Sequence, residues 1–186
     1  MIILLVVMAV GVIAGRVRGG SLRRLGDAHL SWVPVIFIGV VMQGTAASVS
    51  SPGASTALAL TSHLSVFAFA AANSKRPGMI LLAVGGLLNF LVVAANGAMP
   101  VSLDALARAG IGSPAVGPPE LGGLHELMTS ATRLRFLADI IPFRPARHVI
   151  SPGDLALWAG LLLAVQGLMI GSGRRVAGTR RPAESA

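Results

Sequence analysis

Long apolar stretches alternate with short polar links along most of the chain. Five apolar runs cover approximately residues 2–15, 32–49, 54–73, 79–96 and 154–171. A helix needs roughly 20 apolar residues to cross the hydrocarbon core of a bilayer. Four runs approach that length, and the first reaches it if the arginines after it extend their charges to the interface. We therefore predict an all-α membrane protein with about five transmembrane helices, forming a single membrane domain over residues 1–186.

A helix-start signal precedes the fifth run. Ser151 is a favourable N-cap, Pro152 suits the first helical turn, and Asp154 complements the positive end of the helix dipole. The pattern predicts that a helix begins directly after Ser151.

Basic residues are concentrated in three links. If every run spans, the links after the first, third and fifth runs lie on one side, which the positive-inside rule makes cytoplasmic. The charges follow the first run instead of preceding it, so we interpret this run as an uncleaved anchor. The N-terminus is then outside, and the tail over residues 172–186 is cytoplasmic. The ten basic residues are Arg16, Arg18, Arg23, Arg24, Lys75, Arg76, Arg174, Arg175, Arg180 and Arg181.

The composition agrees with a membrane location. Only 12% of the residues are charged, whereas a soluble domain uses roughly 25% to cover its surface. A net charge of +8 would suit nucleic acid in a soluble protein, but these basic residues lie between apolar runs without a nucleic-acid module. The lack of cysteine excludes thiolate metal sites and cysteine nucleophiles. We expect membrane lipid as a partner, and no nucleic acid, cofactor or metal.

One long segment, residues 97–153, falls on the outer side in this topology. Segments of this length in compact proteins are usually functional or disordered. Its residues 102–109 have the pattern of a short capped helix, because Asp104 and Arg108 are one turn apart and Gly110 can stop the helix.

A second, amphipathic helix is predicted within this segment, over residues 124–141. Its apolar residues recur at helical spacing and Pro142 closes it. Such a helix can lie on the membrane surface or cover the end of the bundle. The other face gathers the polar residues His125, Thr129, Thr132 and Asp139, flanked by Arg133 and Arg135.

Two interpretations of this polar face are open. The simpler one, which we favour, is a solvated face on which Arg135 and Asp139 form an i,i+4 ion pair. The other is an outward pocket for a lipid headgroup or a small anionic ligand, because imidazole titrates near neutral pH and guanidinium groups bind carboxylates and phosphates. No catalytic motif, such as a nucleophile elbow or a phosphate-binding loop, is present.

Three polar residues lie inside the apolar runs: Gln43, His63 and Asn89. We favour hydrogen bonding between helices as their role, because no charged residue lies at mid-depth. The same observation makes a small transporter, with a polar path past His63, the least favoured function. Gly11 with Gly15, and Gly167 with Gly171, are pairs that permit close helix approach.

Three short motifs occur in the outer segment and at the start of the fifth run: Asn-Gly-x-Met-Pro-Val from Asn96, Thr-x-Leu-x-Phe-Leu-x-Asp-Ile-Ile-Pro from Thr132, and Ser-x-Gly-Asp from Ser151. They resemble the motifs of a bacterial membrane protein family that is catalogued only as a domain of unknown function. In related chains a glycine precedes the aspartate, where this chain has Ala138. The resemblance implies a multi-helix protein of the bacterial plasma membrane, without a known reaction, cofactor or partner. The residues to test by motif are Asn96, Pro100, His125, Thr132, Asp139 and Asp154.

We expect a non-enzymatic membrane protein that binds a lipid-like ligand or a protein partner through its outer segment. The alternative is a membrane-embedded enzyme acting on a lipid or isoprenoid substrate at the outer interface. His125 would then be the acid or base, oriented by Asp139 or Asp154. Arg133 or Arg135 would hold an anionic group of the substrate. An enclosed polar pocket joining His125 to Asp154 would favour the enzyme, and an exposed polar face the binding protein.

Overall fold

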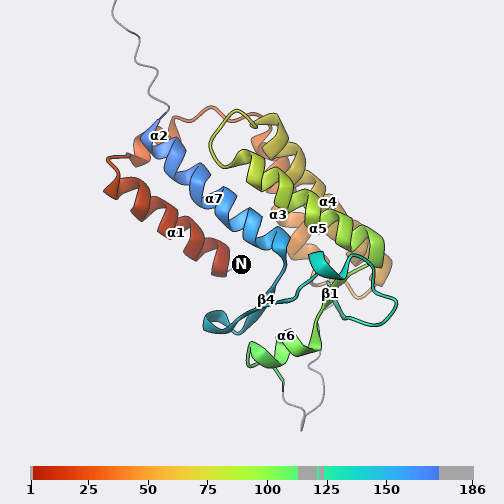
Figure 1. The fold of residues 1–186 in the computed structure, drawn as a ribbon. Helices are drawn as coiled ribbons and strands as arrows, with labels where there is room; N and C mark the ends of the chain where they lie inside the picture. The colour runs from red at the N-terminus through yellow and green to blue at the C-terminus, as the bar shows by residue number, and fades with distance from the viewer. Residues whose placement is uncertain (1, 113–120, 122–123, 172–186) are drawn as a thin grey trace, which may run out of the picture.

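In the computed structural model, which describes residues 2–112, 121 and 124–171, all five apolar runs are helical (Figure 1). The helix bounds lie within about three residues of those predicted from the sequence. The long helices are α1 (Ile2–Val17), α3 (Val33–Ala46), α4 (Pro52–Ala72), α5 (Met79–Asn96) and α7 (Pro152–Ile170), and the short ones are α2 (Leu22–Gly26) and α6 (Leu103–Arg108).

Three of the helices are long and apolar enough to cross a membrane, namely α4, α5 and α7. The helices α1 and α3 are apolar but shorter, with 16 and 14 residues. They also carry large apolar side chains on their outer surfaces, such as Ile13 and Phe37, which are 63% and 66% exposed. Contiguous exposed apolar surface of this kind is compatible with a membrane protein.

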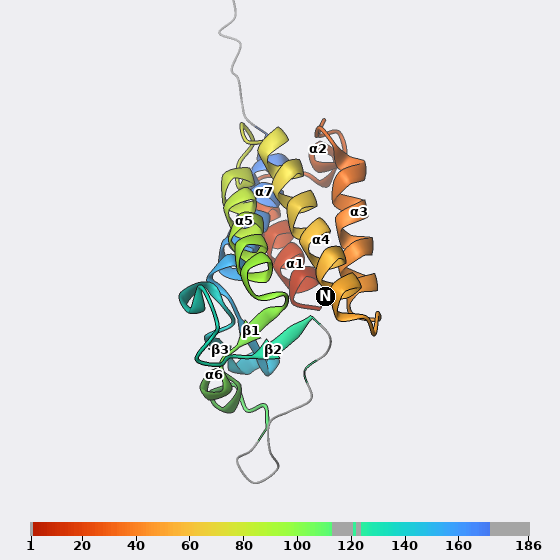
Figure 2. The same ribbon diagram turned by 90° about the vertical axis from the view of Figure 1, so that its right-hand side faces the viewer.

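The long helices pack in the order α3, α4, α5, α7, α1. Figure 2 shows α3, α4 and α5 side by side, and Figure 1 shows α7 between α5 and the N-terminal helix. Glycines allow the close approach between α5 and α7. A Cβ added at Gly160 would lie 2.6 Å from the backbone nitrogen of Leu82, closer than real Cβ atoms come. Gly11 and Gly15 play the same part between α1 and α7, where they face Val165 and Met169. These two glycines therefore permit close helix packing within the chain, as the sequence predicted.

The basic links and the outer segment lie at opposite ends of this bundle. Figure 1 shows α2 and the link between α4 and α5 at one end, and the strands, α6 and the start of α1 at the other. The separation follows from helix direction, because each of these long helices crosses from one end of the bundle to the other.

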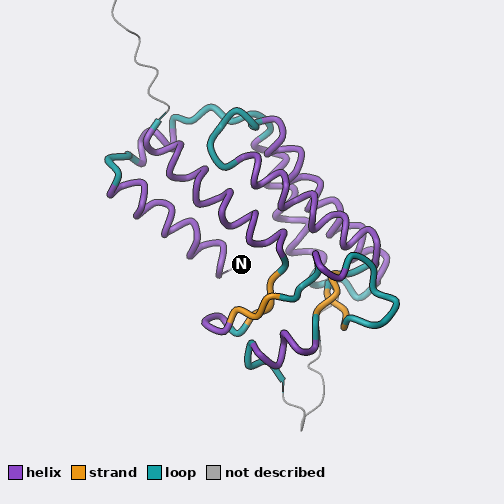
Figure 3. The backbone as a smooth tube through the Cα atoms, in the orientation of Figure 1, coloured by secondary structure: helices purple, strands orange, loops and turns teal. Residues whose placement is uncertain are grey.

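The outer segment contains strands, so the prediction of an all-α fold is wrong in this part (Figure 3). The strand β1 (Met99–Val101) pairs in parallel with β2 (His125–Leu127), and β3 (Ile141–Phe143) pairs antiparallel with β4 (His148–Ile150). Two short 3-10 turns, η1 (Arg135–Leu137) and η2 (Arg144–Ala146), complete the segment. The short helix α6 confirms the prediction for residues 102–109. The Ser102 hydroxyl oxygen accepts a hydrogen bond from the Ala105 amide, and Asp104 pairs with Arg108.

The predicted amphipathic helix over residues 124–141 is also wrong. The backbone there pairs with β1, since the Met99 amide donates to the Leu124 carbonyl and the Met128 amide donates to the Val101 carbonyl. Leu134 has a φ of 51°, in the left-handed region, which no α-helix contains. Apolar residues of this stretch pack on the end of the bundle instead, where Leu124, Met128, Leu134 and Leu137 contact the cluster of Val92, Val93 and Met99.

Candidate functional site

The first turn of α7 is held to α5 by a polar cluster around Asp154. The Ser151 hydroxyl oxygen accepts from the Asp154 amide at 2.9 Å, and Asp154 Oδ2 accepts from the Ser151 amide at 3.1 Å. This capping box confirms the predicted helix start. The other carboxylate oxygen of Asp154 accepts from Asn89 Nδ2 at 2.8 Å, and the Ser151 hydroxyl donates to Asn89 Oδ1 at 2.9 Å. Both carboxylate oxygens of Asp154 therefore have partners.

Asp139 is held in place by backbone hydrogen bonds to β1 and the residue after it. Its amide donates to the Pro100 carbonyl at 3.0 Å, and its carbonyl accepts from the Ser102 amide at 2.9 Å. His125 pairs with Met99 on the other side of the same strand. β1 thus brings together two residues that are 14 positions apart, with Asp139 Oδ2 3.7 Å from His125 Nε2.

The Asp139 side chain is buried, and its other oxygen is not satisfied. Its carboxyl group is 6% exposed, whereas the His125 side chain beside it is 37% exposed. Asp139 Oδ1 is buried and has no hydrogen-bond partner within the described part of the chain. Because buried polar atoms in native proteins nearly always have a partner, this oxygen calls for an explanation.

Burial disfavours the charged form of both members of this pair. Burial, and then the negative charge of Asp154, raise the pKa of Asp139 to about 8. Burial is also the largest cause of a lowered pKa for His125; the charge of His148 acts in the same direction and that of Asp154 opposes it. The 3.7 Å separation is too long for a hydrogen bond. With its pKa raised to about 8, the Asp139 carboxyl group is mostly protonated at pH 7, and burial favours the neutral form of the His125 imidazole as well.

Other residues singled out in the outer segment make local structural contacts. Asn96, at the end of α5, accepts from the Arg133 amide at 2.8 Å and donates to the Arg133 carbonyl at 3.0 Å. Thr129 and Thr132 bond to each other in one turn, in which Thr132 Oγ1 accepts from the Thr129 amide. Arg135 is in η1 and forms no ion pair with Asp139, so the predicted i,i+4 pair is wrong, because the segment is not helical. Pro100 is buried in β1.

The polar residues inside the apolar runs differ in their surroundings. Asn89 donates to Asp154, as described above, and His63 of α4 is partly buried. Gln43 of α3 has a buried side-chain oxygen without a partner among the described residues.

Sequence reasoning missed the bond between Asn89 and Asp154 and the influence of His148 on His125. For both of these contacts, the only indication in the sequence was that the residues are polar or titratable. No group of three or more metal-ligating side chains occurs in the described ranges.

Residues 27–166 match a family model described as "Family of unknown function (DUF5317)". The match covers about three quarters of the chain and includes the outer segment, α3 to α5 and most of α7. The chain therefore belongs to this family. Neither a curated protein nor a solved structure matches the chain.

Proposed function

Taking membership of this family as the premise, we propose that the protein is a multi-pass protein of the bacterial plasma membrane that binds a lipid-like ligand at its extracytoplasmic end. The N-terminus and the outer segment are then outside, and the basic links are cytoplasmic. Two features support this orientation. The links that carry Arg23, Arg24, Lys75 and Arg76 share one end of the bundle, and basic residues are enriched on the cytoplasmic side of membrane proteins.

The observation that carries the binding proposal is the unpartnered oxygen of Asp139 next to the partly exposed His125. Leaving a buried acceptor unsatisfied costs about 1–3 kcal/mol. A hydroxyl or ammonium group of a ligand can offset that cost by donating to Asp139. His125 is the more accessible of the two side chains. The ligand therefore contacts the imidazole ring first, and it reaches the Asp139 carboxyl group by displacing that ring.

The experiment is native mass spectrometry of the protein extracted gently from its own membrane. We expect a co-purifying lipid-like molecule that is lost in His125→Ala and in Asp139→Ala. Asp104→Asn is the matched control, because Asp104 is an exposed acid in the outer segment and lies outside the pair. Retention of the ligand in all three variants would refute the site. A co-purifying protein instead of a lipid would point to a scaffold or assembly function.

A second candidate is an enzyme that acts on a lipid or isoprenoid substrate at the outer interface. The raised pKa of Asp139 favours it, because a carboxylic acid that stays protonated near neutral pH can act as a general acid. The neutral imidazole of His125 is suited to accept a proton in the same cycle. The charge of Asp154 reaches both groups, which links the pair to the first turn of α7. An enzyme would lose turnover in Asp139→Asn while it still bound the substrate, whereas a binding protein would show no turnover in either form.

A further inference from the structure

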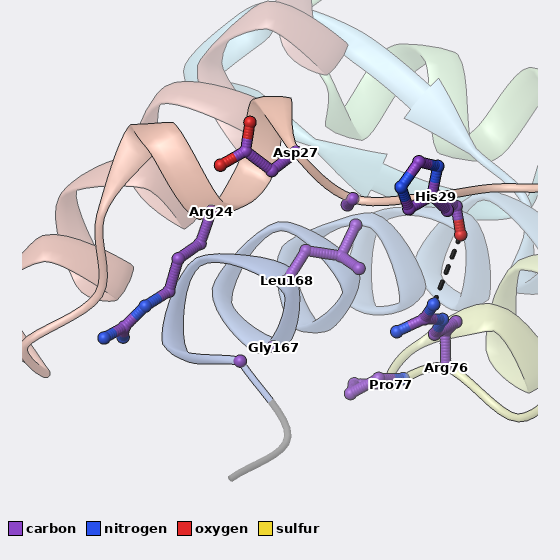
Figure 4. A pocket seen from close by; sticks show the side chains of 9 residues that line it. Arg24, Asp27, His29, Arg76, Pro77, Gly167 and Leu168 are labelled. Carbon is purple, nitrogen blue, oxygen red and sulfur yellow. Dashed lines mark hydrogen bonds between the residues drawn. The ribbon is translucent and has the colours of Figure 1, made fainter.

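A cavity lies at the end of the bundle opposite to His125 and Asp139, where the basic links meet the end of α7. Its volume is about 290 Å³, close to the lower limit for small-ligand pockets. Three segments far apart in the sequence line it (Figure 4). They are α2 with the link that follows it, the link between α4 and α5, and the last turn of α7. Arg24, His29 and Arg76 supply its nitrogen-bearing side chains.

Both arginines are held by backbone carbonyl groups. Arg24 donates from Nη1 to the Ile170 carbonyl at 2.9 Å, which also offsets the negative end of the α7 dipole. Arg76 donates from Nη2 to the His29 carbonyl at 3.2 Å. A guanidinium group carries five N–H donors in a planar fork. Within the described part of the chain each arginine gives one nitrogen to the protein, so further donors remain for a ligand.

The rest of the lining is apolar except for one acid. Pro77 and Leu168 lie in the lining, and Figure 4 shows Leu168 between the two arginines. The acid is Asp27, whose carboxylate lies 3.8 Å from the guanidinium of Arg23 and is directed away from Arg76 in Figure 4. The cavity therefore combines cationic donors with an apolar surface, which suits a charged group attached to an apolar body.

We propose that this cavity binds the phosphate group of an anionic phospholipid. Phosphate oxygens fit the planar fork of arginine, which binds them in a bidentate manner. Basic pockets between helices on the cytoplasmic side are a recurring way of holding such headgroups. The acyl chains would continue along the exposed apolar surface of the bundle. This ligand is separate from the one proposed for His125 and Asp139, and its site is at the other end of the bundle.

The neighbouring basic residues provide matched controls. Arg23 precedes Arg24, and Lys75 precedes Arg76, yet neither Arg23 nor Lys75 lines the cavity. Neutralising any one of the four changes the net charge of the protein equally. A difference between Arg24→Gln and Arg23→Gln, or between Arg76→Gln and Lys75→Gln, therefore reports the cavity and not the general attraction of a basic surface to anionic lipid.

The test is retention of phosphatidylglycerol by the full-length protein, measured by native mass spectrometry after reconstitution in nanodiscs of mixed phosphatidylglycerol and phosphatidylcholine. We expect retention to fall about tenfold in Arg24→Gln and in Arg76→Gln, as loss of a charge-assisted hydrogen bond implies. It should change less than twofold in Arg23→Gln and Lys75→Gln. Equal losses in all four variants, or no retention by the unchanged protein, would overturn the proposal.

Two further arms keep the result interpretable. Ala28→Trp fills the cavity while both arginines stay in place, so retention of phosphatidylglycerol by this variant should also fall. This result does not depend on whether Arg24→Gln disturbs the end of α7, and unchanged retention would count against the cavity.

Inorganic phosphate, added in nanodiscs of phosphatidylcholine alone, distinguishes a lipid phosphate group from free phosphate as the ligand. If the site binds lipid, inorganic phosphate should not raise the unfolding temperature of the protein in these phosphatidylcholine nanodiscs. Stabilisation that disappears in Arg76→Gln would show that free phosphate is the ligand and would overturn the lipid assignment.

Discussion

Replacing Asp139 by asparagine should remove a specific part of the pH dependence of folding stability. Asp139 has a pKa of about 8 in the folded protein, against an ordinary value of 3.8. Between these values the folded state binds a proton that the unfolded state has released. Stability therefore falls as pH rises through this window, and it levels off above about pH 8.

The size of this effect follows from the slope of the linkage relation. One pH unit is worth about 1.4 kcal/mol while one state holds the proton and the other does not. Between pH 6.5 and pH 8 the unchanged protein should lose roughly 1.6 kcal/mol of unfolding free energy through Asp139, because half of the folded molecules have already released the proton at pH 8. The neutral asparagine variant lacks this loss, because an amide of nearly the same shape does not titrate.

The interval from pH 6.5 to pH 8 also separates Asp139 from His125. Burial lowers the pKa of His125, so the unfolded state binds its proton more tightly and stability is lost as pH falls below about 6.5. The two residues thus act with opposite signs, on the two sides of pH 6.5. Unfolding in mixed micelles, followed by circular dichroism at pH 6.5, 7.2 and 8, isolates the contribution of Asp139.

Asp104→Asn is the control for a general effect of removing an acid, because Asp104 is exposed and paired with Arg108 on the same segment. Its pH dependence should match that of the unchanged protein. If Asp139→Asn also follows the unchanged protein between pH 6.5 and pH 8, the carboxyl group is not protonated in the fold. The assignment of a neutral acid beside His125 would then be refuted.

Three other substitutions test further parts of the structure. His125→Gln should flatten the loss of stability below pH 6.5, measured by the same unfolding titration at pH 5, 5.8 and 6.5. Asn89→Ala should lower the unfolding free energy by about 2 kcal/mol, because Asp154 Oδ1 loses its donor and the buried Ser151 hydroxyl loses the oxygen to which it donates; an unchanged midpoint would contradict the cluster. Gly160→Ala should cost about 1–3 kcal/mol by forcing α5 and α7 apart. Gly44→Ala, on α3 where a Cβ meets no atom within 4 Å, should be neutral or slightly stabilising in the same thermal scan.

The sequence predicted those parts of the fold that depend on neighbouring residues. Apolar run length and cap chemistry are local properties, so the bounds of α5 and the capping box at Ser151 could be found without knowledge of the packing. The same holds for α6, whose cap and ion pair are within one turn of each other. The strands could not be found in this way, because β1 and β2 are separated by more than 20 residues and each has only three.

His125 and Asp139 were paired from the sequence for the wrong physical reason. On one face of a continuous helix, residues 14 positions apart are separated by about 21 Å along the axis. They meet at 3.7 Å because β1 holds both, one through strand pairing and the other through an isolated bridge at Val101. The basic cavity was missed altogether. Arg24 and Arg76 were read as topology signals, and nothing in their spacing shows that the end of α7 lies between them.

The degree to which each polar group is satisfied separates structural from functional candidates. Asp154 was a candidate beside Asp139, and its carboxylate oxygens accept from Asn89 and Ser151 in a closed set of hydrogen bonds. Such a set is what a partly buried carboxylate requires for stability alone. Asp139 has no comparable set, since its Oδ2 faces the imidazole at a non-bonding distance and its Oδ1 has no partner in the described chain. A residue selected only for stability would be replaced at little cost by an apolar one there, so the unsatisfied acid is the stronger reason to place ligand binding at Asp139 and His125, with Asp154 acting on them through its charge.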